Sequence, residues 1–458
     1  MKSHGVRIWE IRKRPTKKAS YEVRWRVEGR PFSETFRTKG LADGRRAKLL
    51  TAAKSGEPFD VETGLPDSLA ERAPSLTWFD FAVKYLQVKW PHAAPNTRDS
   101  INEALTDVTL ALLEDRPARS EDQVLRTALR NWAFVVRHDD ENLPPNDVAN
   151  ALHWVSKASM PLAALRDATV VRSVLDRLKL KLDGTPAAAE TTRRKRRVLA
   201  NALKYAVELG EFEEDPLTTV QWTAPKITKS VDPGVVVNPK QARELLTAVS
   251  YIGGYKRARG RRQVAFFATI YFAGLRPAEA VGLVASDCSL PAEGWGLLTL
   301  RKTRPTAGTR WTGTGVVHDH RGLKNRSTEE SRRVPIPPVL VQTLRAHLDQ
   351  FGTAEDGRVF RNERGGILGS TAYWRVWDEA RRLALTPEQT ESPLARRPYD
   401  LRHAALSTWL NAGVDPTEVA ERAGNSVEVL LSRYAKCLDG RQEVANRRIQ
   451  GLLDGDDD

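Results

Sequence analysis

The sequence of 458 residues contains only two cysteines, Cys288 and Cys437. Two thiols provide neither a framework of disulfides nor the paired thiolates of a zinc site, so a reducing cytoplasm is the expected compartment. Long apolar runs are also missing. No uninterrupted apolar stretch approaches twenty residues, and the opening MKSHGVRIWEIRKR contains no segment suitable for a signal peptide. Secretion and membrane spanning are therefore not expected.

Metal-ligating side chains are scarcely clustered. The one visible group is His318-Asp319-His320, whose two histidines fall on the same face of an expected strand. Two ligands do not make a metal site, and the sequence offers no further clustered carboxylates or cysteines. The triplet is interpreted as a polar strand face. Metal-dependent nuclease chemistry is disfavoured, and no metal or other cofactor is predicted.

Acidic residues are outnumbered by basic ones. The sequence holds 58 Asp and Glu against 72 Lys and Arg, which gives a formal net charge of +14. Such an excess favours a polyanionic partner, and nucleic acid is the leading candidate. The length exceeds what a single hydrophobic core serves comfortably, so two to four domains are expected.

The first sixty residues are predicted to form a small β-rich domain. Tyr21, Val23, Trp25 and Val27 alternate with charged residues, which is the pattern of a strand with one buried face. With VRIWEIR before it, FSETFRT after it and a helix over 41–54, this domain has three strands and a helix.

Beside this sheet lies a basic segment, IRKRPTKK, at 11–18. Its density of positive charge suits contact with phosphates. The predicted DNA-binding residues here are Arg12, Lys13, Arg14, Lys17 and Lys18.

From residue 75 to about 220 the periodicity is helical, which predicts an all-α domain. Its last helix, TTRRKRRVLANALKYAVELG, has Thr191 or Thr192 as the expected N-cap and Gly210 at its end. Cations in the first turns oppose the helix dipole, so an anionic partner is expected to compensate them. The predicted phosphate contacts are Arg193, Arg194, Arg196 and Arg197, and Lys195 shares the cluster.

Residues 220–238 contain two prolines and one glycine without sustained periodicity, which indicates an interdomain linker. A third domain, 235–445, opens with helices, passes through a strand-rich region from Trp295 to Pro337, and returns to helices. Residues 446–458 form a C-terminal tail. The predicted fold class is mainly α with small β elements (α+β).

The third domain contains two stretches with unusual features at fixed spacing. In FFATIYFAGLRPAEAVGL, Gly274 can end one helix and Pro277 can begin the next, which holds Arg276 at a rigid corner. Glu279, three residues on, can reach back to orient the arginine or to satisfy the helix end. The second stretch is RRPYDLRHAALSTWLNAGVDPTEVAERAGNSVEVLLSRYAKCL, which contains Arg402.

Tyr434 near the end of that second stretch has two interpretations. Val427, Leu430, Leu431 and Tyr434 fall at i, i+3, i+4 and i+7, which is one face of a helix. By this pattern alone the tyrosine is a packing residue. Only its spacing from other residues suggests chemistry.

Together these segments resemble the tyrosine recombinases, the phage-type integrase family. AGLRPAEAVGL resembles the family's first arginine motif, YDLRHAALSTWLNAG the second, AGNSVEV the position between them and the nucleophile, and SRYAKCL the nucleophile motif. The resemblance covers about 235–445, which would be the catalytic domain. The regions 1–60 and 75–220 are similar, in order and character, to the family's arm-binding and helical core-binding domains.

The resemblance implies roles for individual residues. Arg276 and Arg402 would clamp the scissile phosphate, and Tyr434 would be the nucleophile. Lys324 matches the lysine of the family's β-hairpin, in which GVVHDHRGLK would meet the turn NRSTEES and return as RRVPIP.

Two positions depart from the family's pattern. Tyr399 stands where the family most often has His or Lys, and Asn425 where it usually has His or Trp. Both can donate a hydrogen bond to a phosphate oxygen but neither is a base near neutral pH, so positioning roles are assigned to them. His403 fits the family's Arg-His pair and is interpreted as a structural residue of its helix rather than a base. It is placed, with Glu279, behind the residues that contact the phosphate.

These residue types suit phosphodiester cleavage without a metal. Planar guanidinium groups donate paired hydrogen bonds to phosphate and stay charged, and a partly desolvated ammonium can protonate the leaving 5′ oxygen. The phenol, with a solution pKa of about 10, must lose its proton during attack. A covalent phosphotyrosine conserves the bond energy, so rejoining requires no ATP.

The implied function is a site-specific recombinase that integrates or excises a mobile element through a 3′-phosphotyrosine. Its expected partners are duplex DNA at attachment sites, copies of itself in a tetramer on DNA, and an accessory DNA-bending or excision factor. The expected location is the cytoplasm, in association with the nucleoid. The end of the chain, GRQEVANRRIQGLLDG, carries Val444, Ile449, Leu452 and Leu453 and is expected to dock on a neighbouring protomer. Two alternatives stay open: a non-catalytic DNA-binding regulator derived from a recombinase, and a type IB topoisomerase-like enzyme.

Overall fold

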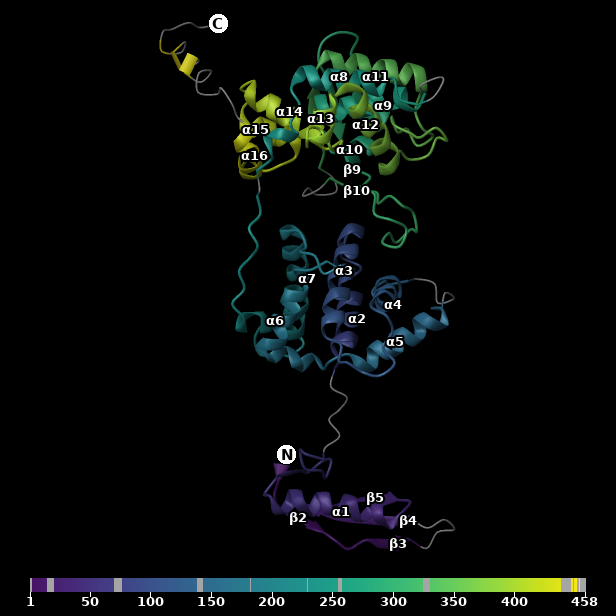
Figure 1. Cartoon of the computed structure of the whole chain (residues 1–458), viewed down its shortest axis with the longest axis vertical. Coiled ribbons are helices and arrows are strands. Elements are labelled where there is room, and N and C mark those ends of the chain that lie inside the picture. The colour runs from purple at the N-terminus through teal and green to yellow at the C-terminus, as the bar shows by residue number, and fades with distance from the viewer. Residues whose placement is uncertain are drawn as a thin grey trace. The chain divides into compact units, whose positions relative to one another are not determined.

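The fold is mainly α with small β-sheets, as predicted (Figure 1). The computed structural model describes residues 2–14, 20–69, 76–137, 143–181, 183–228, 230–253, 258–323, 330–437, 446–447, 449–450 and 453. The chain divides into two compact units. One comprises Met1–Phe81 with Ser159–Arg166, and the other comprises Ala82–Ala158 with Asp167–Asp458.

The N-terminal sheet is built around β4 (Ser20–Val27), which pairs antiparallel with β5 (Arg30–Phe36) on one side. On its other side β2 (Val6–Ile8) pairs with one half of β4 and β3 (Arg12–Arg14) with the other half. β2 and β3 thus occupy the place of one interrupted strand. The predicted arrangement of three strands and a helix is therefore present, with the first strand broken in the middle.

Helix α1 (Lys39–Lys54) lies along one face of this sheet (Figure 1). Val23, Trp25 and Val27 alternate with charged residues along β4, so they share one face of the sheet. All three are buried in one apolar cluster with side chains of α1. The short strands β1 (Lys2–Ser3) and β6 (Phe59–Asp60) pair antiparallel beside it.

The helical region contains six α-helices among its described residues, with a π-helical turn directly after α4 and a 3₁₀ turn shortly before α6. They are α2 (Trp78–Lys89), α3 (Pro95–Ala111), α4 (Asp122–Ala128), α5 (Asn146–Ala158), α6 (Ala168–Arg177) and α7 (Ala189–Glu208). Helix α7 begins at Ala189, so the predicted N-cap at Thr191 or Thr192 is wrong. Both threonines lie in the first turn, and Thr192 is buried. The helix ends before Gly210, whose φ of 78° is in the left-handed region.

The C-terminal region consists of helices around a small three-stranded sheet of order β11-β8-β7. The sheet is formed by β7 (Cys288–Ser289), β8 (Gly296–Leu300) and β11 (Arg332–Ile336). A separate two-stranded sheet is formed by β9 (Lys302–Thr303) and β10 (Arg321–Gly322). The helices of the region are α8 (Pro239–Val249), α9 (Ala258–Phe272), α10 (Pro277–Gly282), α11 (Pro338–Phe351), α12 (Ser370–Ala384), α13 (Pro387–Glu391), α14 (Asp400–Asn411), α15 (Pro416–Ala423) and α16 (Val427–Tyr434).

Two hydrophobic clusters hold these helices together. The larger is centred on α9, where Phe267 stacks on Trp377 of α12 at a centroid distance of 4.9 Å. The smaller gathers apolar side chains of α14, α15 and α16, with Leu430 and Tyr434 both buried. Helix α16 therefore docks through the face predicted from the sequence, although Leu431 on that face is 38% exposed.

The predicted β-hairpin of GVVHDHRGLK with RRVPIP is wrong. The return strand β11 pairs antiparallel with β8, so that Arg332 lies opposite Leu300. Within 315–323 only Arg321–Gly322 forms a strand, and it pairs with β9. The two segments were expected to pair with each other. Instead β11 pairs with β8, and β10 pairs with β9.

In the part of the chain that the structure describes, no helix is both long enough and apolar enough to cross a membrane. Of the four apolar tail residues, Ile449 and Leu453 are exposed, at 55% and 80%. Val444 and Leu452 lie outside the described residues.

Candidate active site

The corner between α9 and α10 positions Arg276. Helix α9 ends at Phe272, and Gly274 follows with a φ of 59°, a left-handed conformation that glycine adopts without strain. A Cβ there would lie 2.9 Å from atoms of Leu406 and Trp409, so the close packing against α14 also requires glycine. Pro277 starts α10, and Arg276 is its N-cap residue. The corner is built as the sequence predicted.

Glu279 performs both tasks that its spacing suggested. Its Oε2 accepts a hydrogen bond from the Arg276 backbone N–H at 2.8 Å, and its Oε1 accepts one from the Arg276 Nη1 at 2.8 Å. The carboxylate is buried, which opposes ionisation. The guanidinium groups of Arg332, Arg276 and Arg402 outweigh that cost and lower the pKa of Glu279 to about 2.

Sequence analysis missed Arg332, the principal partner of Glu279. Arg332 is buried on β11, and its Nη1 and Nη2 donate to the two carboxylate oxygens of Glu279 at 2.9 and 2.7 Å. Strand alternation could have revealed it, because Val334 and Ile336 point into the core and Arg332 shares their face. Arg333, one residue on, is exposed.

The low pKa of Glu279 predicts an acid dependence of stability. In the unfolded chain this carboxyl group titrates near 4.5, so the ion pairs contribute fully above that pH and their contribution is lost as the pH falls toward 2. Between pH 6 and pH 3 the expected loss is about 2 kcal/mol of unfolding free energy. Denaturant titrations at several pH values should therefore show a steeper acid decline for the wild type than for Glu279→Gln. Parallel curves for the two proteins would contradict this prediction.

Arg402 on α14 is almost fully buried and joins two chain segments. Its Nη1 donates to the carbonyl oxygen of Gly274, and its Nη2 donates to the carbonyl oxygen of Ala423 at 2.7 Å. Burial and the neighbouring Arg276 lower the pKa of its guanidinium from the ordinary value. The second arginine is therefore held at the ends of α9 and α15 rather than on a mobile surface.

Arg276 is likewise tied to the end of α15. Its Nη2 donates to the carbonyl oxygen of Gly424 at 2.9 Å and to Oδ1 of Asn425 at 3.1 Å. Gly424 ends α15 with a φ of 64°, and a Cβ there would lie 2.4 Å from Nη1 of Arg332. The segment 423–425 thus brings the two predicted phosphate-binding arginines together. It also places Asn425, one of the two departures from the family's pattern, against the first of them.

Tyr399, the other departure, interacts with Arg276 as well. Burial lowers the pKa of the Arg276 guanidinium, but Glu279 and Tyr399 more than offset this, and the pKa is raised overall. The Tyr399 ring also packs against His403 with a centroid distance of 5.0 Å. Both departures therefore lie beside the predicted arginines, as positioning roles require.

Tyr434 is 1% exposed, which agrees with a packing residue, yet its hydroxyl has a specific polar partner. The Tyr434 Oη lies 2.8 Å from Nδ1 of His403, and the rings meet edge-on at a centroid distance of 5.7 Å. Burial raises the pKa of Tyr434, while Arg402 acts in the opposite direction. His403, interpreted from sequence as a structural residue, thus contacts the predicted nucleophile directly.

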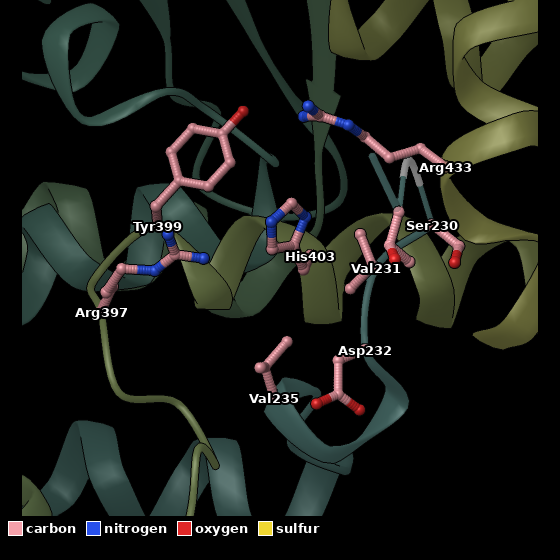
Figure 2. A pocket seen from close by; sticks show the side chains of 9 residues that line it. Ser230, Val231, Asp232, Val235, Arg397, Tyr399, His403 and Arg433 are labelled. Carbon is pink, nitrogen blue, oxygen red and sulfur yellow. The ribbon is translucent and has the colours of Figure 1, made fainter. Parts of the chain in front are cut away.

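A cavity of about 310 Å³ opens beside this group. Tyr399, His403 and Arg433 line it from the helices, and residues of the linker line its other side (Figure 2). The Val231 backbone N–H donates to the carbonyl oxygen of Arg433 at 2.6 Å, so the linker is hydrogen-bonded to the residue before Tyr434. Arg433 is a second residue that sequence analysis missed, although its adjacency to Tyr434 was a signal for it.

The catalytic lysine predicted at Lys324 lies outside the described residues, as do Lys17 and Lys18 of the basic N-terminal segment. His318 and His320 do not form a strand face, because 304–320 is built of turns and isolated bridges. Within the described ranges, no group of three or more His, Cys, Asp or Glu side chains could hold a metal ion.

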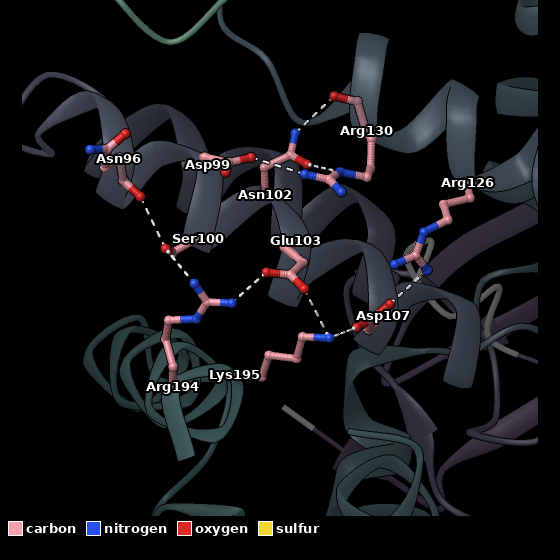
Figure 3. A network of polar contacts seen from close by, with 10 residues as sticks. All are labelled: Asn96, Asp99, Ser100, Asn102, Glu103, Asp107, Arg126, Arg130, Arg194 and Lys195. Atoms are coloured by element: carbon pink, nitrogen blue, oxygen red, sulfur yellow. Dashed lines mark hydrogen bonds and ion pairs between the residues drawn. The ribbon is translucent and has the colours of Figure 1, made fainter. Parts of the chain in front are cut away.

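The basic cluster of α7 is compensated largely from within the protein (Figure 3). Lys195 is buried, and its Nζ lies 2.6 Å from Asp107 and 3.1 Å from Glu103, both on α3. Arg194 pairs with Glu103 at 2.6 Å. For these two residues the expected anionic partner is thus a carboxylate of α3.

The other three arginines of α7 differ from one another. The guanidinium of Arg196 stacks over the ring of Trp222 at 4.4 Å, and Arg193 is half-buried. Arg197 is exposed and lines a surface cavity of about 690 Å³ together with Lys89 and His92. Arg197 is therefore the α7 side chain best placed to meet a phosphate.

This difference predicts unequal effects on DNA binding. Arg197→Ala is expected to reduce the slope of log affinity against log salt by about 0.9, the value for one lost phosphate contact. Arg194→Ala is expected to change the slope by less than half as much, because Glu103 already neutralises that charge. Fluorescence anisotropy of a labelled duplex at several salt concentrations measures both slopes, and equal changes would refute the assignment.

The N-terminal sheet carries further exposed basic residues. Arg12, Lys13 and Arg14 form β3 and are all exposed, and their contact with DNA stays a prediction. Sequence analysis did not single out Trp9, around which three guanidinium groups gather at 5.7 to 6.0 Å from the ring centroid. They belong to Arg7, Arg24 and Arg26.

No family model and no curated protein matches the sequence of the chain. The solved structures that are similar to it in fold include the following three. A Tn1549 transposon integrase in complex with transposon right end DNA is 16% identical, over 72% of this chain and 98% of that one, with a TM-score of 0.46. The XerH site-specific recombinase in a post-cleavage complex with palindromic difH substrate is 14% identical, over 81% and 95%, with a TM-score of 0.47.

The third is lambda integrase, in a tetramer bound to a Holliday junction. It is 13% identical, over 91% of this chain and 95% of that one, with a TM-score of 0.45. All three are tyrosine recombinases, the family that the sequence motifs of this chain resemble.

Proposed function

We propose that the protein is a site-specific DNA recombinase that cleaves and rejoins duplex DNA through Tyr434. The observation that carries this proposal is the convergence of three separate chain segments. Arg276 from the α9–α10 corner contacts the end of α15, Arg402 from α14 reaches the same end, and Tyr434 packs against α14. Two guanidinium groups and a phenol are thereby held by one small part of the fold.

In the proposed reaction the scissile phosphate binds to Arg276 and Arg402, which neutralise the charge that develops on the non-bridging oxygens. Tyr399 and Asn425 position the same phosphate through hydrogen bonds. The Tyr434 oxygen attacks the phosphorus to form a 3′-phosphotyrosine, and the 5′ oxygen leaves with a proton from Lys324. Neither a metal ion nor ATP takes part in this scheme.

The proposed substrates are attachment sites in two duplexes, held by four copies of the chain, which integrate or excise a mobile element. An accessory factor would bend the DNA or direct excision. The basic sheet face and Arg197 support DNA as the partner. The exposed Ile449 and Leu453 support docking of the tail on a neighbouring copy.

Trapping of the covalent intermediate tests the proposal. A binding site is first selected from a random duplex library by retention on native gels. Single-turnover reactions then use that site with a nick that lets the cleaved fragment escape. On denaturing gels the wild type is expected to give a protein–DNA adduct, and Tyr434→Phe none. The matched control Tyr373→Phe removes the hydroxyl of a tyrosine that packs against Phe266, outside the proposed site, and is expected to keep the adduct.

The same reactions separate the alternatives. A regulator without catalytic activity would shift the selected DNA on native gels and never form the adduct. A topoisomerase-like enzyme would relax supercoiled plasmids that lack the selected site. Either result would overturn the proposed function.

A further inference from the structure

The hydroxyl of Tyr434 is hydrogen-bonded to a ring nitrogen, and the direction of that bond matters. His403 Nδ1 lies 2.8 Å from the Tyr434 Oη. Burial, together with Arg433, Arg397 and Arg402, lowers the pKa of His403 to about 4. At neutral pH the imidazole is therefore uncharged. In the tautomer with hydrogen on Nε2, Nδ1 accepts the phenolic hydrogen.

The surroundings of His403 leave it as the proton acceptor for the phenol. Arg433 faces it from α16, Arg397 from the segment before α14, and Asp232 lines the same cavity from the linker (Figure 2). Tyr399 contacts the ring from its other side. Arginine only donates, and tyrosine is a poor acceptor of a full proton near neutral pH. The Asp232 carboxylate accepts from the Gly234 backbone N–H, whereas the phenol is hydrogen-bonded to His403. Attack by the phenol nevertheless requires that its proton leave, and burial makes this harder.

We propose that His403 is the general base of the strand-cleavage reaction, an inference that rests on the proposed function. As the Tyr434 oxygen bonds to phosphorus and the bond to the 5′ oxygen breaks, the phenolic proton passes to Nδ1 of His403. The imidazole becomes an imidazolium, and the leaving 5′ oxygen receives its proton from the ammonium of Lys324. In rejoining, the imidazolium returns its proton to the departing phenolate.

Bound DNA makes this transfer easier than the free protein suggests. The cavity beside His403 is lined by Arg397 and Arg433, which disfavour a positive imidazole. A DNA phosphate near these arginines offsets their charge and raises the proton affinity of the ring. The base is thus weakest in the free protein and becomes stronger when DNA binds beside Arg397 and Arg433.

The test compares rates of adduct formation for variants at position 403. His403→Asn keeps a hydrogen-bond acceptor near the place of Nδ1 but removes the base. It is expected to slow single-turnover cleavage by about 10²–10⁴-fold while DNA affinity is unchanged. His403→Ala provides a second variant, and added imidazole is expected to restore part of its rate. Thermal unfolding of both variants checks their folding.

A more acidic nucleophile separates a base from a packing residue. With fluorotyrosine incorporated at position 434, the phenol loses its proton more readily. This replacement is therefore expected to raise the cleavage rate of His403→Asn by a larger factor than the cleavage rate of the wild type. Equal effects of fluorotyrosine on both proteins, or a rate for His403→Asn within about threefold of wild type, would overturn the base assignment alone. Failure of the wild type to form any adduct would overturn the proposed function as well.

Discussion

Replacing Arg332 by methionine is expected to lower the unfolding free energy by about 3–5 kcal/mol. The substitution removes the two hydrogen bonds, of 2.9 and 2.7 Å, that Arg332 donates from β11 to the buried carboxylate of Glu279, and a charge in that position cannot be rehydrated. Strand cleavage is expected to fall as well, because Glu279 orients Arg276. Denaturant titration and single-turnover cleavage measure the two losses. Arg333→Met, the same change on the exposed face of β11, is the matched control and should alter neither.

A double variant separates stability from catalysis. When Glu279 is also replaced by methionine, its carboxylate no longer lies buried without Arg332, so the free energy of unfolding is expected to recover in part. The recovery is incomplete because Arg276 and Arg402 lose a compensating negative charge. Cleavage should stay low, since Arg276 has then lost its orienting carboxylate. A double variant as unstable as Arg332→Met, or one that cleaves normally, would contradict the role assigned to this ion pair.

Arg402→Lys is expected to reduce the rate of strand cleavage by about 10²–10³-fold, although the positive charge is kept. The guanidinium of Arg402 donates to the carbonyl oxygens of Gly274 and Ala423, and in the proposed clamp it also donates to the scissile phosphate. A lysine ammonium is a single point of charge and cannot span those positions with a planar fork. Single-turnover reactions on the nicked substrate measure the rate.

Two controls make this result interpretable. Arg382→Lys, on the exposed side of α12 where the arginine pairs with Asp378, should leave the rate unchanged. Anisotropy with uncleaved duplex should show similar affinity for Arg402→Lys and wild type, because one buried contact among many phosphate contacts contributes little to binding. Cleavage by Arg402→Lys at a near-normal rate would remove Arg402 from the proposed phosphate clamp.

Local sequence signals predicted the elements of the site well. Gly274 and Pro277 marked the corner that holds Arg276, because left-handed glycine and a helix-starting proline are properties of the chain itself. The alternation in 20–27 likewise predicted the buried face of the N-terminal sheet. Each of these features depends on residues within a few positions of one another.

Features that depend on tertiary partners were harder to predict. The strand Arg332–Ile336 was recognised, but pairing with β8 instead of 315–324 is decided by packing between segments. The cations at the start of α7 suggested DNA, whereas Asp107 and Glu103 of α3 compensate Lys195. The contact of His403 with Tyr434 joins residues thirty-one positions apart, and neither sequence spacing nor composition specifies it.

The hydrogen bond from the Val231 amide to the Arg433 carbonyl has a mechanical consequence. Val231 belongs to an extended segment outside any helix, and it is buried in the same apolar cluster as Tyr434. Tension along that segment would be transmitted through one short backbone bond to the residue beside the reactive phenol. In the proposed reaction, the position of Tyr434 would in this way depend on how tightly the connector between the helical and C-terminal regions is drawn.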